Sequence, residues 1–383
     1  MFELRSRGKG SAVVFLPWLE EQVAADSLGK NVFSFEEILK FKMFHLLSGF
    51  KGGGLVGIRP YLEKADSPNR IDPLFVKSVC KILNEQNIEP ILCDTSFKFN
   101  DRHDNLTRHY KNLNKTGQNS FHCESVPFAL LDGITGEQEI CIDLKSKIEN
   151  VSPSTLTTSS LNDFNAYLAG EISELGGLIM LTSPHSHPQS GINGAIKNLG
   201  FGLSSKKGKI KQYSKSKPKV NPSNCTLCGK CIVNCPTRAI SKGPNQHVII
   251  DHDLCIDCGK CVNIAYFGGI SYDFDASPEF SQLSTVIQAL GAWQILQNKI
   301  TFCNFLLNFE LDQNGEKKVI NIGILFSKDP VAIDQATIDL INEGHPSLID
   351  QVMDIKLPVN NLISLAEQLK IGQREYELIS VAY

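Results

Sequence analysis

The sequence lacks any run of about 18 apolar residues, the length that a membrane-spanning helix requires. Its first apolar stretch, residues 12–16, ends at Pro17 and is too short for the core of a signal peptide. It also lacks an excess of charge, since 38 Lys and Arg residues stand against 41 Asp and Glu residues. The composition therefore does not favour a nucleic-acid or membrane partner, and we expect a soluble, cytoplasmic protein.

Cysteine is concentrated in one part of the chain. Of 383 residues, 42% are hydrophobic, which is enough for two or three units with real cores and excludes a disordered or fibrous protein. Seven of the twelve cysteines lie between Cys225 and Cys261, and such clustering in a long chain favours metal binding over disulfides.

The first four cysteines of this group have the spacing C-x2-C-x2-C-x3-C, followed by proline. They are Cys225, Cys228, Cys231 and Cys235. This spacing is typical of a cubane iron–sulfur cluster. A four-cysteine zinc site is the alternative, but it gives no role to the closely spaced third and fourth cysteines or to the proline.

The pattern repeats thirty residues later without its last cysteine, because Ala265 stands in the fourth position. The duplicated segment resembles a bacterial two-cluster ferredoxin, in which the fourth cysteine of each run binds the cluster of the other run. The resemblance implies one complete [4Fe–4S] site and a second site with only three cysteines. The complete site would comprise Cys235, Cys255, Cys258 and Cys261, and the second site Cys225, Cys228 and Cys231.

The three-cysteine site leaves three alternatives open. It could hold a [3Fe–4S] cluster, or no cluster at all. It could also hold a [4Fe–4S] cluster in which one iron is exposed or is bound by another ligand, such as Cys303 or a histidine. An iron without a protein thiolate could act on a substrate as a Lewis acid.

Outside this segment, apolar runs alternate with stretches of helical periodicity. We predict strands at 12–16, 55–58, 89–93, 127–131 and 177–181, and helices at 35–47, 73–83 and 164–172. The alternation predicts an α/β body with a mostly parallel sheet, interrupted by a small α+β ferredoxin-like insert.

Polar residues follow several of the predicted strands, where ligands bind in parallel sheets. We predict catalytic roles for Asp94, Asp132, His185 and His187, which would line one crevice. The alternative for each Asp is a helix cap or turn residue, and the two histidines, expected in a loop, could instead be metal ligands or plain surface residues.

A glycine-rich stretch at 191–202 and a lysine-rich stretch at 204–224 follow. The glycines allow a ligand to approach the backbone, and Lys197 could meet an anion, but the stretch is neither a P-loop nor a GxGxxG motif. Residues 204–224 contain seven lysines and no acidic residue, and we interpret them as a linker into the insert. An acidic redox partner or a phosphorylated substrate could dock there, whereas Tyr213 alone does not make a nucleic-acid site.

The C-terminal part returns to the α/β body. Strands are expected at 301–309 and 319–326 around the turn Asn314-Gly315, and Asp329 is expected to cap a helix at 331–341, followed by another helix at 362–369. The predicted organisation is therefore a body at 1–215 and 276–383 with a ferredoxin-type domain at 216–275.

The chain resembles the iron–sulfur branch of the domain-of-unknown-function family 362. The resemblance is carried by 194–202, Gly208-Lys209, the two cysteine runs and 322–336, and by Arg102, Gly133 and Gly136. It implies an α/β body with a ferredoxin insert, and we assign Lys197, Asn198 and Lys209 to cofactor binding. This family has no assigned reaction that could be carried over.

The chain departs from that family at three points. The usual Ser-His-Phe-Lys-Gly-His stretch is replaced by 182–187, which keeps only the last histidine, His187. A Cys-Asp-Cys element expected after the strand at 301 is missing, and the eighth cluster cysteine is Ala265. We expect Cys80, Cys93, Cys141 and Cys303 to be inert buried thiols, and Cys123 has no predicted place.

Three functions follow as hypotheses. The first is an oxidoreductase that passes electrons through the complete cluster to a small organic substrate in the crevice. The second is a non-redox enzyme that uses the three-cysteine cluster as a Lewis acid or sulfur donor, or clusters that only stabilise the insert. The third is an electron carrier that docks a partner enzyme.

Overall fold

The computed structural model describes residues 10–17, 54–60, 71–96, 126–134, 136–149, 164–265, 267–313, 316–353, 357 and 360–380. The predicted helix at 35–47, Arg102 and Cys123 lie outside these residues. Among the described residues, no helix is both long and apolar enough to cross a membrane.

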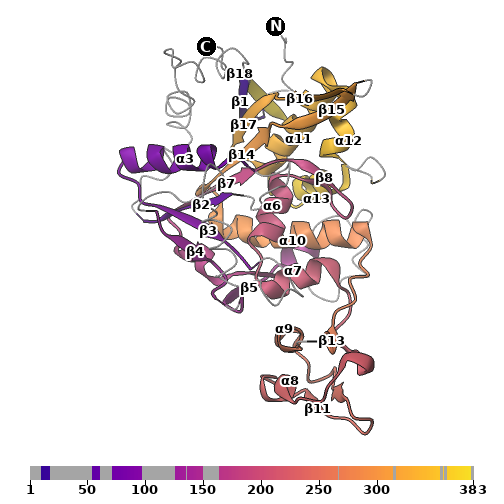
Figure 1. The fold of residues 1–383 in the computed structure, drawn as a ribbon. Coiled ribbons are helices and arrows are strands. Elements are labelled where there is room, and N and C mark those ends of the chain that lie inside the picture. Colours follow the sequence, from indigo (N-terminus) through magenta and orange to yellow (C-terminus); the bar gives the residue numbers. More distant parts are fainter. Residues whose placement is uncertain are drawn as a thin grey trace.

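The body is built on an eight-stranded sheet (Figure 1). Its strands, in spatial order, are β18 (Tyr376–Ser380), β1 (Ser11–Pro17), β17 (Gly323–Ser327), β14 (Ile300–Leu306), β7 (Gly177–Thr182), β2 (Val56–Pro60), β3 (Pro90–Asp94) and β4 (Phe128–Leu130). Only β17 runs antiparallel to its neighbours, β1 and β14, and the other pairs are parallel. The predicted α/β class with a mostly parallel sheet is confirmed.

Helices cover both faces of the sheet, which explains why the central strands are apolar along their whole length. One face packs against α6 (Ala195–Gly202), α10 (Pro278–Leu296), α11 (Pro330–Gly344) and α13 (Asn360–Gln368). The other face packs against α3 (Pro73–Glu85). Every residue of β7 and β14 is buried between these layers.

Three predicted segments differ in the structure. Residues 164–172, expected as a helix, form β6 (Asn165–Ala169) and the 3-10 helix η3 (Gly170–Glu174), because β6 pairs with β5 (Glu139–Asp143) and packs beneath α10. Residues 204–224 are not simply a linker, because they contain α7 (Lys206–Tyr213), in which Lys206 and Lys209 are buried. His185 and His187 lie on a strand rather than in a loop, since β8 (His185–His187) pairs with β9 (Gly191–Asn193).

The C-terminal elements agree with the expectation in part. The predicted strand at 301–309 is interrupted after Leu306, where β14 ends, and the one at 319–326 is interrupted before Gly323, where β17 begins. The expected turn Asn314-Gly315 lies outside the described residues. The β15 strand (Phe309–Gln313) and β16 (Glu316–Ile320) form an antiparallel hairpin, and the Asp329 carboxylate accepts hydrogen bonds from Val331 and Ala332 at the start of α11. The remaining short helices of the body are α5 (Lys145–Glu149), η5 (Pro346–Leu348) and α12 (Ile349–Val352).

The segment between α7 and α10 projects from the body and has its own hydrophobic cluster (Figure 1). It contains β10 (Lys219–Val220), η4 (Pro222–Asn224), α8 (Lys230–Val233), β11 (Ile240–Lys242), β12 (Val248–Ile250), α9 (Lys260–Ile264) and β13 (Ile270–Ser271). We call residues 219–271 the insert. Its first strand pairs with its last, β10 with β13, whereas β11 pairs with β12, so the two sequence repeats share both small sheets.

Candidate functional site

The two cysteine loops have the same backbone conformation. Leu227 and Asp257, each two residues after the first cysteine of its run, have φ values of 52° and 60°. Gly229 and Gly259, one residue after the second cysteine, have φ values of 75° and 72°. These left-handed residues turn each loop so that its three cysteines can face a common space, and a glycine adopts that conformation without strain.

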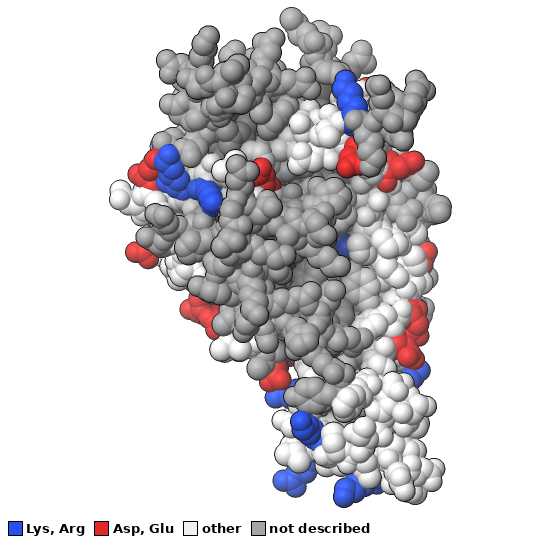
Figure 2. All heavy atoms as spheres, in the orientation of Figure 1, with Lys and Arg blue, Asp and Glu red and all other residues white. Residues whose placement is uncertain are grey.

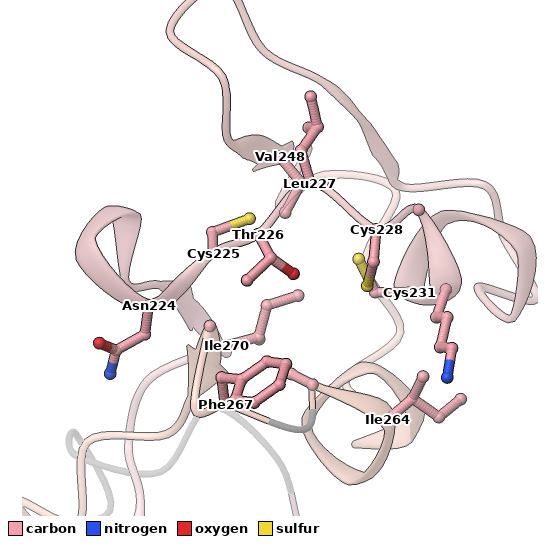
Figure 3. A pocket seen from close by; sticks show the side chains of 14 residues that line it. Asn224, Cys225, Thr226, Leu227, Cys228, Cys231, Val248, Ile264, Phe267 and Ile270 are labelled. Carbon is pink, nitrogen blue, oxygen red and sulfur yellow. The ribbon is translucent and has the colours of Figure 1, made fainter.

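The first loop surrounds a cavity of about 110 Å³. Figure 3 shows Cys225 on one side of it and Cys228 and Cys231 on the other. Ala265, at the C-terminal end of α9, contributes to the lining from the second repeat. This arrangement is the one expected when the fourth position of one run serves the cluster of the other run, with alanine in place of the cysteine.

The donor set fits an iron–sulfur cluster better than a single metal ion. No group of three or more His, Cys, Asp or Glu side chains in the described part of the chain could hold one ion. In a cubane cluster each of four thiolates serves one of four irons, so the cysteines surround the cluster instead of meeting at one point. The arrangement of the cysteines around the cavity is compatible with such a cluster.

The protein environment acts on the cysteine thiols in both directions. The Ala239 N–H donates to Cys235 Sγ over 3.2 Å, the kind of contact that tunes cluster potential. A hydrogen bond from the Lys230 backbone lowers the pKa of Cys228, whereas burial raises the pKa of Cys261 to about 12. Coordination to a metal would deprotonate such a thiol outright.

The second loop packs against the body. Ile210 of α7 belongs to the hydrophobic cluster of the insert, and its Cδ1 atom stands 3.0 Å from the place where a Cβ on Gly259 would lie. Lys211, the next residue of α7, forms an ion pair of 2.8 Å with Asp257, and the Tyr272 hydroxyl donates to the other Asp257 oxygen over 2.6 Å. The second cysteine loop, with Cys255, Cys258 and Cys261, therefore lies on the body side of the insert.

A further ion pair joins this loop to the body, between Lys260 and Glu137 at 2.9 Å. Cys303, one suggested substitute for the missing ligand, is fully buried in β14 among the core residues on the α3 side of the sheet. It therefore cannot reach the cavity. Among the described residues, no histidine lines the cavity.

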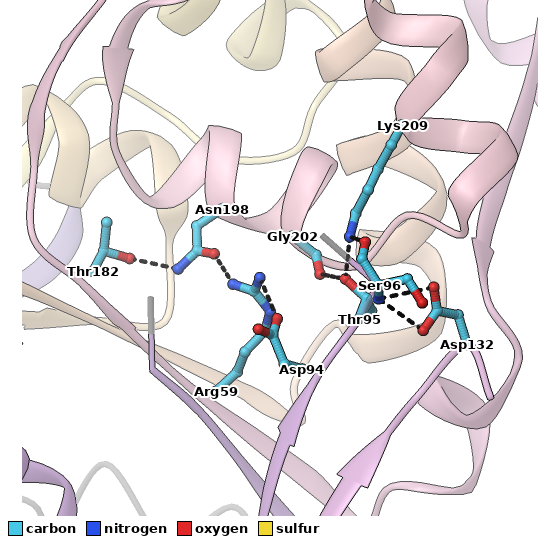
Figure 4. A network of polar contacts seen from close by, with 9 residues as sticks. All are labelled: Arg59, Asp94, Thr95, Ser96, Asp132, Thr182, Asn198, Gly202 and Lys209. Carbon is cyan, nitrogen blue, oxygen red and sulfur yellow. Dashed lines mark hydrogen bonds and ion pairs between the residues drawn. The ribbon is translucent and has the colours of Figure 1, made fainter. Parts of the chain in front are cut away.

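The carboxyl ends of the parallel strands carry a buried polar network (Figure 4). Arg59 of β2 and Asp94 of β3 form an ion pair of 2.8 Å, with side chains 3% and 1% exposed. Arg59 also donates to Asn198 Oδ1, and Asn198 Nδ2 donates to Thr182 Oγ1 over 2.8 Å. Asn198 thus links the ends of β2 and β7.

A second part of the network lies beside the first. Lys209 Nζ donates to Thr95 Oγ1 over 2.6 Å and to the Ser96 carbonyl oxygen. Both Asp132 oxygens accept from the Ser96 N–H, at 2.9 and 3.0 Å. Burial raises the pKa of Asp132, while the Lys209 charge and the Ser96 hydrogen bonds oppose the rise.

The predicted histidines form a third group with Lys197. Burial lowers the pKa of His187 to about 2, and the charges of Lys197 and His185 act in the same direction. His187 is therefore neutral near pH 7, and its Nδ1 accepts hydrogen bonds from the Gln189 and Ser190 backbone. His185 Nε2 lies 3.1 Å from Asn193 Nδ2 across the β8–β9 hairpin.

Aromatic rings connect this group with Lys209. Phe201 lies 5.6 Å from the Tyr213 ring, and Tyr213 lies 6.5 Å from the His187 ring, both measured between centroids. The ammonium groups of Lys197 and Lys209 stand 5.9 and 5.3 Å from the centroid of Phe201. Lys197, His187 and Lys209 therefore surround one pair of rings.

Asp334 of α11 fixes the helix that carries Lys197 and Asn198. Its carboxylate accepts from the Ala195 and Ile196 N–H groups, at 2.7 and 2.9 Å, and so caps α6. A Cβ on Gly194 would lie 2.4 Å from Asp334 Oδ1, so a residue without a side chain is needed there. Burial raises the pKa of Asp334 to about 6.

The structure therefore brings most of the predicted body residues together in three adjoining groups. Arg59, Ser96 and Phe201 were not predicted. A charged residue inside the apolar strand β2 was the available signal for Arg59, because buried arginine requires a partner. Cys80, Cys93 and Cys303 are buried as expected, but Cys141 is exposed because it points outward from β5.

Comparison with known proteins gives one likeness in sequence and one in structure. A ferredoxin from Alicyclobacillus acidocaldarius subsp. acidocaldarius is 43% identical over 49 residues, which are 13% of this chain. The chain spans 60% of the length of that ferredoxin. The lactate racemase apoprotein from Thermoanaerobacterium thermosaccharolyticum aligns with 99% of this chain and 85% of its own, at 10% identity and a TM-score of 0.37.

A third comparison covers most of the chain. Residues 56–339 match the family described as "Domain of unknown function (DUF362)". The match extends from β2 through the insert to α11, so it includes all three groups of the polar network as well as both cysteine runs. The chain therefore belongs to the DUF362 family.

Proposed function

We propose that the chain is an iron–sulfur oxidoreductase that delivers electrons from the insert to a small organic substrate bound at the carboxyl ends of the sheet. The observation that carries this proposal is the position of α7. Lys209 of this helix enters the buried polar network, while the next two residues, Ile210 and Lys211, contact the second cysteine loop. One rigid element thus joins the complete cluster site to the candidate substrate site.

The chain would hold its clusters through the cysteines of the two runs. Cys235, Cys255, Cys258 and Cys261 would bind the cluster nearer the body, and Cys225, Cys228 and Cys231 the cluster of the cavity. When bound, such clusters supply one-electron transfer. The ferredoxin likeness over 49 residues supports this assignment.

The body residues would bind and orient the substrate. Lys197 and Lys209 are buried cations near the same aromatic rings, which favours a negatively charged substrate. Neutral His187, whose Nδ1 accepts backbone hydrogen bonds, could donate a hydrogen bond to the substrate from Nε2. Asp132, whose pKa is raised by burial, could exchange a proton with it. Arg59 contacts both Asp94 and Asn198, and these contacts would hold the site in shape.

A redox partner would dock at the end of the insert remote from the body. Residues 175–250 contain no Asp or Glu, and Lys230, Arg238 and Lys242 are exposed in this part of the insert. In Figure 2 the lower end of the molecule shows blue side chains and no red ones. From the sequence, a partner was expected to dock at residues 204–224. We move the proposed docking site to the end of the insert, because Lys209 is buried and Lys211 is paired with Asp257. We therefore infer an acidic electron donor.

The test is to change Cys258 to Ser and to use Cys141→Ser as the matched control, since Cys141 is exposed and remote from both loops in sequence. Each protein is purified without oxygen, assayed for iron and sulfide, reduced with dithionite, and mixed with a panel of small organic acids. Reoxidation is followed by the cluster absorbance. We expect a substrate to reoxidise the wild type and Cys141→Ser but not Cys258→Ser. Equal reoxidation of all three, or a wild type without iron, would overturn the proposal.

A further inference from the structure

We propose that the cluster of the first loop has one iron without a protein thiolate, and that this iron binds a small external thiolate that enters the cavity beside Ala265. The proposal rests on the proposed function only in requiring a cluster at the first loop. It concerns what the cavity admits, not the direction of electron flow.

The internal duplication defines the vacant ligand position. Ala265 follows α9 as Cys235 follows α8, thirty residues earlier. Ala239 donates its N–H to Cys235 Sγ, and the residue equivalent to Ala239 in the second repeat is Gly269, which lines the cavity. The second repeat thus keeps a backbone N–H at the equivalent position but has a methyl group in place of CH₂–S.

The described lining of the cavity offers no replacement ligand of the usual kind. Besides the three cysteines, the polar side chains that line it belong to Asn224, Thr226 and Lys230. Their amide, hydroxyl and ammonium groups are poor ligands for iron in a sulfide cluster, which prefers thiolate. Tyr266, beside Ala265, lies outside the described residues and is therefore included in the experiment.

The cavity is accessible and suits a small anionic ligand with an apolar body. Cys228 and Thr226 are exposed, and Phe267 is 65% exposed, so the lining reaches solvent. Apolar side chains, including Ile264 and Ile270, form much of the remaining wall (Figure 3). Lys230 supplies the positive charge that would attract a thiolate. Binding forms one iron–sulfur bond, displaces solvent from the same iron, and changes no oxidation state.

The experiment uses the holoprotein, loaded with ⁵⁷Fe, and 2-mercaptoethanol as the probe. Mössbauer spectra are recorded with and without the thiol for the wild type, Ala265→Cys, Ala265→Ser and Tyr266→Phe. The wild type should contain about eight irons per chain, in two clusters of four. One of the eight irons should have an isomer shift and a quadrupole splitting distinct from those of the rest. Both values should change when thiol is added.

The variants separate the explanations. Ala265→Cys should lose both the distinct iron and its response, whereas Ala265→Ser and Tyr266→Phe should keep both. If Ala265→Cys fails to fold, the wild type and the other two variants still decide. A wild type that does not respond, about four irons per chain, or loss of the distinct iron in Tyr266→Phe would each overturn the inference. If the wild type does not respond to thiol, but a substrate reoxidises it and does not reoxidise Cys258→Ser, then only this inference is overturned. The oxidoreductase proposal then stands.

Discussion

Replacement of Arg59 by Met should destabilise the body strongly. Arg59 and Asp94 are almost fully buried and lie 2.8 Å apart, so solvent screens their attraction little. Removing one partner of such a pair leaves a buried charge and costs about 3–5 kcal/mol. The same change removes the hydrogen bond to Asn198. We therefore expect the free energy of unfolding to fall by an amount within that range.

The measurement is anaerobic urea unfolding followed by far-UV circular dichroism, with the midpoints compared at a constant slope. Arg374→Met is the control, because Arg374 and Glu367 form an ion pair whose side chains are 39% and 30% exposed. Such a pair contributes at most about 1 kcal/mol. The double variant Arg59→Met, Asp94→Asn should lose less than Arg59→Met alone, since it no longer buries an uncompensated charge. If Arg59→Met costs no more than the control, the network does not hold the site as we describe.

Three further changes test other parts of the molecule. The raised pKa of Asp334, about 6, means that its contribution to stability is present below its ordinary pKa of 3.8 and is lost as pH rises through about 6. The stability of wild type relative to Asp334→Asn should therefore be higher at about pH 5 than at about pH 7 in urea unfolding. Asp257→Asn keeps the left-handed backbone but removes the charge paired with Lys211, so it should cost about 1–3 kcal/mol and speed proteolysis between the body and the insert. Lys230→Glu combined with Lys242→Glu should slow reduction by an acidic plant-type ferredoxin and abolish the salt dependence of the wild-type rate, and an unchanged rate would refute docking at this end.

The sequence predicted the elements whose signal is local. The cysteine spacing defined both loops, and Asp329 followed by proline marked the start of α11. Long apolar runs such as β7 indicated buried parallel strands. Each of these signals arises within a few residues, so no knowledge of the tertiary structure was needed.

The errors arose where distant contacts decide the local structure. Residues 165–169 form a strand because β5 and α10 pack against them, contacts that helical periodicity does not register. Lys209 was assigned to cofactor binding but also fell within the stretch interpreted as a linker, and the structure buries its ammonium group against Thr95 and Ser96. Asp94 and Asp132 were correctly placed at strand ends, but Arg59 shows that part of this region is a filled network and not an open crevice.

The strand order of the main sheet determines when this protein can finish folding during synthesis. The insert lies in the chain between β7 and β14, which are neighbours in the sheet, and β1 pairs with β17, about 300 residues later. The cysteine loops therefore leave the ribosome while β7 still has an open edge and β1 has neither of its partners. A cluster assembled on the insert at that stage would be held by a nascent chain whose body is incomplete. Because α7 contacts the second loop, a cluster acquired early would fix one wall of the body before the sheet closes, and iron supply would affect folding yield as well as activity.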